Sequence, residues 1–388
     1  MNRINQSITK LSDYLVKSGF KGYDPYDTLN STLPISKMGK WVSAVAIQFQ
    51  KRNPINIRTL LGVKKGYNPK GMGLMLKAYC LRYKQTNKEE DKHHADFLFE
   101  WLKTNSSYGY SGRCWGYNFD WANPGGTLKA YSPSVVVTAF VIDGIWEYYH
   151  LTKNEDAKQM IISSADYIMN DLPRTSFDYG LSIAYTQQST GACYNASLLG
   201  AETLMKAYSF THNEDLHAVA SKAVAFVISK QKKNGAWYYS YNPEKRTERK
   251  QIDFHQGFIL VSLYNYLHLL NRPDRVVDSA IAKGLEFYKK EQFFKNGQAL
   301  WRLPKKYPIE IHNQAQGIIT FSLLKEYDTS YLAFSEQIAK WTIDNMQDKK
   351  GYFYYQFHKY YKIKIPYTRW SQAWMLLAFS QLNTIKNG

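Results

Sequence analysis

The stretch "QKKNGAWYYSYNPEKRTERKQIDFHQGFILVSLYNYLHLL", residues 231–270, contains the pattern that decides the fold. It begins with a Gln-x3-Gly-x-Trp string (Gln231, Gly235 and Trp237), continues through a basic loop, and ends in an apolar segment that starts near Asp253. Glycine is common just past a helix end, so we expect Gly235 to terminate one helix at a left-handed C-cap position. We expect the aromatic side chain that follows to fill the gap between neighbouring hairpins.

The apolar segments recur along the chain with a nearly constant period. Their starting positions differ by 61, 59, 62, 59 and 57 residues. Between them lie amphipathic segments, whose apolar residues recur at three and four with charges on the opposite face, as in helices that cover a core. The segments that are apolar nearly all round are therefore predicted to be buried inner helices. They begin at Gly71, Ser132, Gly191, Asp253, His312 and Arg369.

This alternation predicts an all-α fold, an (α/α)6 toroid in which six helical hairpins close into a ring. Closure explains why no atypical polar repeat is needed at either end. The segment "PISKMGKWVSAVAIQFQKRN", residues 34–53, is expected to supply the outer helix of the first hairpin. Residues 1–35 would then be an N-terminal helix and an arm loop packed on the toroid, and residues 36–388 a single toroid domain.

The Gln-x3-Gly-x-Trp pattern is repeated in related strings from Gln231, Gln292 and Gln347. It resembles a motif of α/α toroid proteins, which include triterpene cyclases, six-hairpin glycosidases, polysaccharide lyases and glucuronyl C5-epimerases. The resemblance implies the architecture of most of the chain. For the lyases and epimerases it also implies Tyr, His, Asn and Arg at the mouth of the ring, but it assigns no individual catalytic residue.

The net charge indicates the chemical class of the partner. A formal charge of +18 implies a polyanion, which could be a nucleic acid, an acidic lipid surface or an acidic polysaccharide. The chain has no helix-turn-helix, zinc-finger or RNA-binding signature, so we expect no nucleic acid partner. The aromatic content of 16% is high enough to fill a large core and line a cavity. We therefore expect an acidic saccharide as the substrate.

The remaining composition favours a cytoplasmic protein without a cofactor. The first twenty residues contain no apolar signal region, and no later stretch has the length of a transmembrane segment. Cys80, Cys114 and Cys193 have unmatched spacings, which suit reduced thiols. None has a zinc-like Cys or His partner nearby, so we expect no metal ion.

The chemistry is predicted to lie at one end of the ring, where long loops lead into the inner helices. Three of these loops are basic and would concentrate an anionic substrate; a solvated rim without a ligand is the alternative. Their cations are Lys245, Arg246, Arg249 and Lys250; Arg302, Lys305 and Lys306; and Lys359, Lys362, Lys364 and Arg369. The inner-helix starts add Tyr131, Ser132, Tyr194, Asn195, Asp253, His255, His312, Asn313, Gln316, Tyr367, Arg369 and Trp370.

Two further loops are expected at the same end. "GFKGYDPYDTLNSTLP", residues 19–34, is predicted to bring Tyr23, Asp24, Tyr26 and Asp27 over the mouth. The alternative is a buried Tyr–Asp clasp that fastens the N-terminal arm. "SYGYSGRCWGYNFDWANPGG", residues 107–126, adds Arg113, Trp115, Tyr117, Asp120 and Trp121, which suit gripping a sugar ring. A glycine-rich loop packed on its own aromatic side chains is the alternative there.

Two reaction types fit these residues. Proton abstraction at C5 of a uronate, as in a lyase or epimerase, needs the carboxylate neutralised and a proton moved by Tyr or His. His255, His312, Tyr194, Asp253 and Arg369 are the catalytic candidates. The substrate-binding candidates are Tyr23, Asp24, Tyr26, Asp27, Arg113, Trp115, Tyr117, Asp120, Trp121, Tyr131, Asn195, Asn313, Gln316, Tyr367 and Trp370. Glycoside hydrolysis needs two carboxylates, for which no pair is singled out by spacing. Its candidates are Asp24, Asp27, Asp120, Asp253 and Glu310.

The sequence thus favours an enzyme acting on a uronate-containing poly- or oligosaccharide, with surface-polysaccharide biosynthesis as one setting for it. A noncatalytic glycan-binding scaffold is one alternative. A terpene cyclase or prenyltransferase is another, but the Asp-x-Asp-Asp and Asp-Asp-x-x-Asp strings of terpenoid enzymes are absent.

Overall fold

The inner helices form a closed ring. The computed structural model describes residues 3–123 and 126–387. Each inner helix packs on the next, and the last packs on the first, so the ring has no free end. The inner helices are α3 (Pro69–Thr86), α5 (Val135–Thr152), α7 (Tyr194–Thr211), α9 (His255–Leu270), α11 (Ile311–Leu323) and α13 (Trp374–Asn387).

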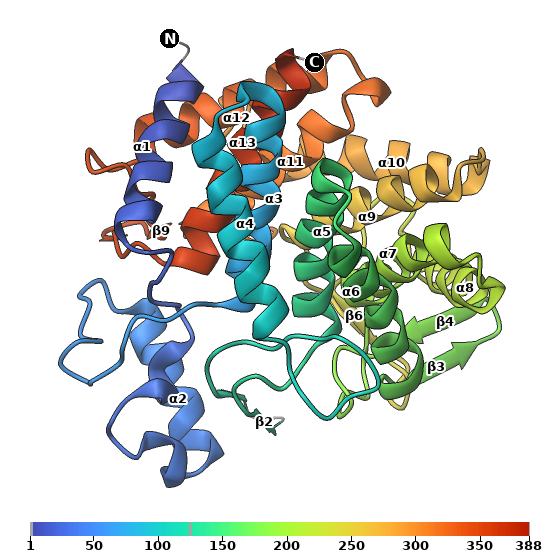
Figure 1. Cartoon of the computed structure of the whole chain (residues 1–388), viewed down its shortest axis with the longest axis horizontal. Coiled ribbons are helices and arrows are strands. Elements are labelled where there is room, and N and C mark those ends of the chain that lie inside the picture. The colour runs from blue at the N-terminus through green and yellow to red at the C-terminus, as the bar shows by residue number, and fades with distance from the viewer. Residues whose placement is uncertain (1–2, 124–125, 388) are drawn as a thin grey trace.

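A second layer of amphipathic helices surrounds the inner ring (Figure 1). These helices bury one face and expose charged residues on the other, as the sequence predicts. They are α1 (Arg3–Lys17), α4 (Glu89–Thr104), α6 (Glu155–Asp166), α8 (Glu214–Ser229), α10 (Arg275–Gln292) and α12 (Ser330–Met346). Among the described residues, no helix is long and apolar enough to cross a membrane.

Short turns join α3, α5, α7, α9 and α11 to the outer helices that follow them, at the end opposite the mouth. Four inner helices end at a residue in the left-handed conformation, which turns the chain back: Asn87, Lys153, His212 and Asn271. The outer helices that follow three of these turns start with a capping side chain, provided by Asn154, Asn213 and Asp274.

At the other end, long loops pair in small antiparallel sheets. Strands β5 (Ala192–Cys193), β6 (Ser240–Asn242) and β7 (Thr247–Arg249) form one sheet, and β8 (Ile309–Glu310), β9 (Gln356–Phe357) and β10 (Lys362–Ile363) form another. Hairpins β1–β2 (Trp121–Asn123 and Gly126–Leu128) and β3–β4 (Arg174–Phe177 and Gly180–Ile183) complete this end. Since β5 and β8 lead directly into α7 and α11, these sheets fix the starts of the inner helices.

The repeated glycine does not end a helix, which corrects the expected C-cap role. Helix α8 ends at Ser229, and Gly235 lies beyond it in a turn with φ of +90°. A Cβ there would lie 2.2 Å from the carbonyl oxygen of Lys283 on the next outer helix, α10. The glycine therefore allows the turn to touch that helix. Gln231 Nε2 donates to Ala280 O on α10 (2.9 Å), and the buried Trp237 fills the gap as expected.

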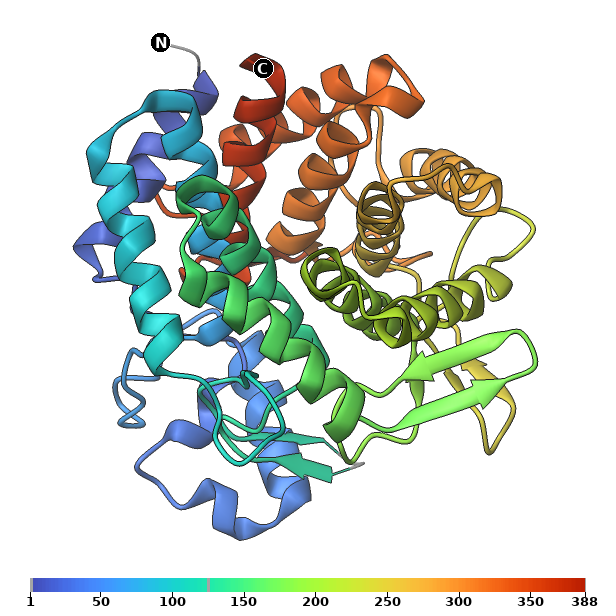
Figure 2. The ribbon, with the colours of Figure 1, turned by 45° about the vertical axis from the view of Figure 1, so that its right-hand side comes forward.

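The same motif in the last repeat contacts α1. Gln347 Nε2 donates to Ser7 O (3.2 Å), and Ser7 Oγ donates to Gln347 Oε1 (2.8 Å). A Cβ on Gly351 would lie 2.2 Å from Lys10 O. Helix α1 therefore stands in the position that the next outer helix occupies in other repeats, and it closes the outer layer beside α12 and α13 (Figures 1 and 2).

The expectation that residues 34–53 form the first outer helix is therefore wrong. Helix α2 (Lys40–Arg52) packs on β1 and on the two short 3-10 turns before it, Asp27–Asn30 and Ile35–Met38. It lies away from α1 and below the ring in the view of Figure 1. Together with the chain around it, α2 forms an arm between α1 and α3.

Candidate active site

Asp253 and His255 form a hydrogen-bonded pair at the start of α9. The His255 Nδ1 lies 2.5 Å from Asp253 Oδ1, and the backbone N–H of His255 donates to the same oxygen (3.2 Å). Gln251 Nε2 donates to Asp253 Oδ2 (2.7 Å), and Arg302 Nε lies 3.6 Å from that oxygen. Nδ1 is therefore occupied, while the imidazole side chain is 17% exposed, which leaves Nε2 for a ligand.

The charge of Asp253 suits a carboxylate that accepts a hydrogen bond from His255 Nδ1. Burial raises the pKa of the carboxyl, but the His255 imidazole and its hydrogen bonds outweigh burial and hold this pKa below its ordinary value. An ionised carboxylate at Nδ1 fixes the tautomer that carries its proton on Nδ1 and leaves the lone pair on Nε2.

His312 lies near the start of the neighbouring inner helix, α11, and is almost fully buried. Neither of its ring nitrogens has a hydrogen-bond partner among the described residues. Burial and the cations of Lys70 and Arg369 lower the pKa of His312 well below its ordinary value, so the ring is neutral near pH 7. A buried polar group without a partner costs free energy, and such groups are concentrated at functional sites.

Phe254 connects the two histidines. Its ring centroid lies 4.3 Å from that of His255, at an interplanar angle of 25°, and 4.3 Å from that of His312, at 12°. His312 also contacts Trp370 (4.9 Å) and Trp374 (4.7 Å). Both imidazoles therefore lie in one aromatic cluster at the starts of two adjacent inner helices.

Lys70 belongs to this cluster and was not predicted from the sequence. It follows Pro69 at the start of α3 and is 4% exposed. Its Nζ lies 4.1 Å from the ring centroid of Phe140 and 5.3 Å from that of Trp374, and no described carboxylate forms an ion pair with it. Burial and nearby Arg369 lower the pKa of this amine well below its ordinary value, although Asp24 opposes the shift.

The sequence feature that could have identified Lys70 was its position at the start of an inner helix. A charged residue directly at the start of an otherwise apolar inner helix stands where His255 and His312 stand in their own repeats. Lysine at a helix start is ordinarily solvated, so this signal alone does not distinguish a buried lysine from a surface one.

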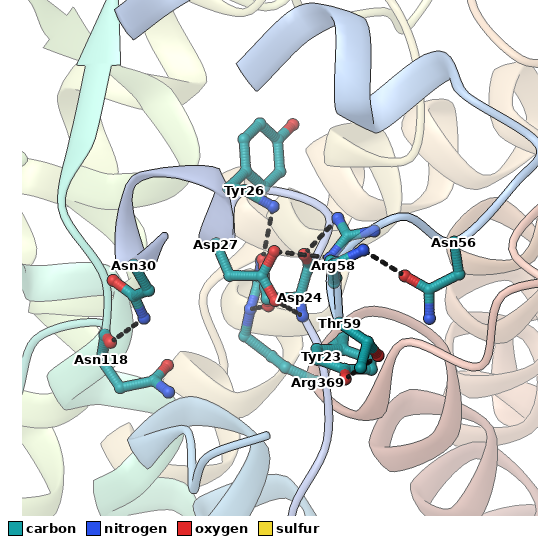
Figure 3. A network of polar contacts seen from close by, with 10 residues as sticks. All are labelled: Tyr23, Asp24, Tyr26, Asp27, Asn30, Asn56, Arg58, Thr59, Asn118 and Arg369. Atoms are coloured by element: carbon teal, nitrogen blue, oxygen red, sulfur yellow. Dashed lines mark hydrogen bonds and ion pairs between the residues drawn. The ribbon is translucent and has the colours of Figure 1, made fainter. Parts of the chain in front are cut away.

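Arg369 is held at the mouth by the arm (Figure 3). Its Nε and one terminal nitrogen donate to the two oxygens of Asp24 at 2.6 and 2.7 Å, and both side chains are buried. Arg58 Nε donates to Asp27 Oδ1 (2.6 Å) and its other end to Asp24 O (2.9 Å). The Asp24 N–H donates to Asp27 Oδ2 (2.8 Å). The "YDPYD" stretch is therefore a clasp of carboxylates and arginines.

The tyrosines of the arm contact other groups. Tyr26 packs on Trp370 with 5.6 Å between ring centroids, and Lys51 Nζ donates to its hydroxyl (2.5 Å). Tyr23 OH lies 3.2 Å from Thr59 Oγ1 (Figure 3). Because Trp370 contacts His312, Tyr26 brings the arm to the edge of the histidine cluster, whereas the two carboxylates fasten it.

Glu310 lies beside the same tryptophan. Trp370 Nε1 donates to Glu310 Oε1 (2.6 Å), and Gln356 Nε2 donates to Oε2 (3.0 Å). Burial raises the pKa of Glu310, although Lys51 and these hydrogen bonds oppose the shift. A carboxyl group with a raised pKa therefore lies next to Trp370, which belongs to the histidine cluster.

Several other predicted residues have part of their hydrogen-bonding capacity engaged inside the fold, although Asn313 Oδ1 and Gln316 Oε1 have no partner among the described residues. Tyr194 OH donates to Glu248 Oε1 (2.6 Å), and Cys193 Sγ donates to Asn195 Oδ1 (3.0 Å). Asn313 Nδ2 donates to Leu300 O (2.8 Å), Gln316 Nε2 donates to Thr320 Oγ1 (3.1 Å), and Tyr367 lies buried beside Arg58. Their contacts support the loops and helices around the mouth.

The predicted loop at residues 107–126 divides into two parts. Tyr117 lies at the mouth, with the Arg369 guanidinium 4.9 Å from its ring centroid. Trp115 is fully buried and donates from Nε1 to Leu102 O (3.1 Å), and Arg113 donates to Ser106 Oγ (2.7 Å). Asp120, Trp121 and the half-exposed Tyr131 lie at or near the β1–β2 hairpin.

The basic loops provide exposed cations around the site. Arg249 lies over Tyr239 at 5.0 Å from the ring centroid, and Tyr239 packs edge-on against His255 at 4.8 Å. Arg302 reaches toward Asp253 from the next loop. The exposed cations are Lys245, Arg246, Lys250, Lys305, Lys306, Lys359, Lys362 and Lys364. Within the described residues, no cluster of His, Cys, Asp and Glu is arranged to hold a metal ion.

Comparison with solved structures agrees with the ring. Cellobiose 2-epimerase from Bacillus thermoamylovorans B4167 superposes with a TM-score of 0.65 at 15% identity, over 84% of this chain and 90% of that chain. A possible GH105 member from Salmonella enterica serovar Paratyphi A gives 0.66 at 13% identity, over 99% and 94%. The chain has the (α/α)6 toroid fold. The GH76 α-mannanase of Bacteroides thetaiotaomicron gives 0.61 at 14% identity, over 82% and 87%.

These likenesses confirm the predicted six-hairpin toroid. No protein-family model matches the sequence, and no curated protein is similar to it.

Proposed function

We propose that the protein is a carbohydrate-active enzyme that moves a proton at a carbon atom of an acidic saccharide. The observation that carries this proposal is the pair of imidazoles stacked on Phe254, one backed by a carboxylate and one with both nitrogens unpartnered. Epimerisation and β-elimination both begin with removal of a C–H proton, and both need groups of this kind.

His255 is the proposed general base. Asp253 holds the proton of Nδ1, so Nε2 carries the lone pair that accepts the substrate proton. The imidazolium that forms is stabilised by the ionised Asp253, as a carboxylate stabilises the histidine of other acid–base sites.

His312 is the proposed second acid–base group. Its ring is neutral, so one nitrogen carries a proton to donate and the other accepts one. Hydrogen bonds from the substrate would partner nitrogens that the protein leaves without partners. Two such groups allow one proton to leave one face of a carbon and another to be delivered to the opposite face of the same carbon, which epimerisation requires.

Lys70 and Arg369 are the proposed groups that neutralise the substrate carboxylate. A bound carboxylate next to the buried amine of Lys70 favours its protonated form, which pairs with the anion. Neutralising a carboxylate increases the acidity of the neighbouring C–H, so binding and catalysis use the same cations. The exposed cations on the loops attract the anion toward the mouth.

The names given to solved structures of this fold support proton transfer on sugars. They include cellobiose 2-epimerase and D-mannose isomerase. Because the sequence identity is low, the substrate of this chain has to be inferred from its own residues. The cations at its mouth favour an acidic substrate.

The test uses uronate-containing oligosaccharides in deuterated water, followed by NMR and by absorbance of the unsaturated uronate. Deuterium at C5 or a new double bond is expected. His255→Asn and His312→Asn are each expected to lower this rate by about 10²–10⁴-fold, as loss of an acid–base group does. His93→Asn, on the exposed face of α4, is the matched control and should leave the rate unchanged. Binding of these saccharides without either signal would overturn the proposal.

Glycoside hydrolysis is a second candidate because of Glu310. Its raised pKa suits a general acid, and the ionised Asp253 on the neighbouring helix start suits a general base. New reducing ends, without deuterium incorporation or a double bond, would favour hydrolysis. Glu310→Gln would then abolish the reaction.

A further inference from the structure

Exposed apolar side chains are concentrated on the arm. Of the 17 large hydrophobic side chains that are exposed among the described residues, eight lie between positions 33 and 60. Exposed apolar residues are ordinarily scattered, and a contiguous group of them marks a contact surface. The eight residues are Leu33, Met38, Trp41, Val42, Val45, Phe49, Ile55 and Leu60, and we call them the arm patch.

Helix α2 presents the centre of this patch as one stripe. Trp41, Val45 and Phe49 follow one another at intervals of four residues and are 61%, 67% and 65% exposed. The opposite face of the helix, including Ser43 and Ile47, is buried. A surface groove of about 670 Å³ lies along the stripe, lined also by Pro54 and Ala122 of β1. The stripe therefore faces solvent while the rest of α2 is fixed.

The charge around the patch has one sign. Residues 28–88 contain no Asp or Glu. Lys37, Lys40 and Arg52 lie exposed on or just before α2, and Lys64 and Lys65 lie exposed farther along the arm. Arg58 is neutralised by Asp27 inside the clasp, so it does not belong to this surface. An apolar stripe flanked only by cations is complementary to a surface that combines apolar and anionic groups.

We infer that the arm patch binds the surface of an anionic lipid bilayer. Trp41, Val45 and Phe49 would enter the boundary between headgroups and acyl chains, and the flanking lysines would contact lipid phosphates, as in interfacial amphipathic helices. Leu60, which is 86% exposed, is a further exposed apolar side chain of the arm beyond α2. This inference does not depend on the proposed function of the mouth.

A second copy of the chain fits this surface less well. A symmetric dimer places the same patch of both subunits against each other. Lys37, Lys40 and Arg52 would then meet their own copies, and residues 28–88 contain no Asp or Glu to compensate. A bilayer with anionic headgroups supplies that compensation.

The test is co-sedimentation of the full chain with phosphatidylcholine vesicles that contain or lack phosphatidylglycerol. Binding is expected with phosphatidylglycerol only, and it should weaken as salt is raised. The variant Trp41→Glu/Val45→Glu/Phe49→Glu is expected to reduce the binding constant at least about tenfold, since it removes apolar area and adds three anionic charges. Val276→Glu, at a 65% exposed position on α10, is the control and should bind as the unaltered chain does.

Three results would overturn the inference. One is equal binding of the triple variant and the unaltered chain, and another is the absence of binding to phosphatidylglycerol vesicles. The third is a dimer of the unaltered chain in light scattering together with a monomer of the triple variant, which would assign the patch to self-association. Thermal unfolding of the triple variant checks that it is folded. If it is not, Lys37→Gln/Lys40→Gln/Arg52→Gln, which leaves the apolar stripe intact, must still lower binding for the inference to stand.

Discussion

Replacing Asp24 by asparagine tests whether the clasp holds the arm or binds the substrate. Asp24 accepts two hydrogen bonds from Arg369 at 2.6 and 2.7 Å, and the two residues are 4% and 2% exposed. Asparagine has nearly the same shape but no charge, so Asp24→Asn leaves the Arg369 guanidinium buried without a counter-ion. Lys70 and His312 lie close to that guanidinium, but both side chains are basic, so neither can replace Asp24 as its counter-ion.

The expected loss of stability can be worked out from the structure. Removing one partner of a buried ion pair costs about 3–5 kcal/mol. An unfolding entropy of about 2.1 cal/mol/K per residue gives roughly 0.8 kcal/mol/K for the 388 residues, so the melting temperature should fall by about 4–6 °C. The double variant Asp24→Asn/Arg369→Met removes the unpaired charge and should recover most of this loss.

The assay is calorimetric unfolding of the single and double variants, together with deuterium exchange into the substrate. A fall in melting temperature that the double variant reverses would support the clasp. If Asp24→Asn melts within about 1 °C of the unaltered protein yet loses substrate binding, the stability reasoning is wrong. Asp24 would then act on the substrate.

Three further predictions concern charge and packing. Burial raises the pKa of Asp27 to about 6, so folding favours the protonated carboxyl. The free energy of unfolding should therefore fall as pH rises from about 4 to 6, and melting curves of Asp27→Asn should lack that fall. Lys70→Met should raise the melting temperature near pH 7, with a gain that shrinks toward about pH 10.4, while isothermal calorimetry shows weaker anion binding. Gly351→Ala should lower the melting temperature more than Gly39→Ala, because both have positive φ but only a Cβ on Gly351 meets Lys10 O.

The ring could be predicted because it rests on local signals that repeat. Each inner helix is apolar nearly all round, and each interval is close to sixty residues, so the alternation is visible without tertiary information. The first outer helix was misassigned because residues 3–17 and 40–52 both fit an amphipathic helix. The last Gln-x3-Gly motif could have corrected this assignment. Each motif contacts the next outer helix, and α1 is the helix that Gln347 contacts.

The site was predicted less completely because burial and hydrogen bonding depend on the assembled fold. The sequence placed Asp253, His255 and His312 at helix starts, and the structure brings them into one cluster. It could not show that Asn313 donates to the carbonyls of its own loop, since these atoms are 13 and 12 residues apart along the chain. Lys70 was missed for the converse reason, because nothing local shows that aromatic rings surround it.

The charges at the mouth favour an anionic ligand. Lys70, Arg369 and His312 lie close together with Asp24 as the carboxylate that pairs with Arg369, so the buried basic groups outnumber their counter-ion. Burial lowers the pKa of both Lys70 and His312, which favours their neutral forms and costs free energy that a purely structural core would avoid. A bound carboxylate reverses that cost by stabilising the proton on Lys70. Under the proposed function, the arrangement that lowers stability is therefore the one that would give an acidic substrate its affinity, and Lys70→Met separates the two effects in one protein.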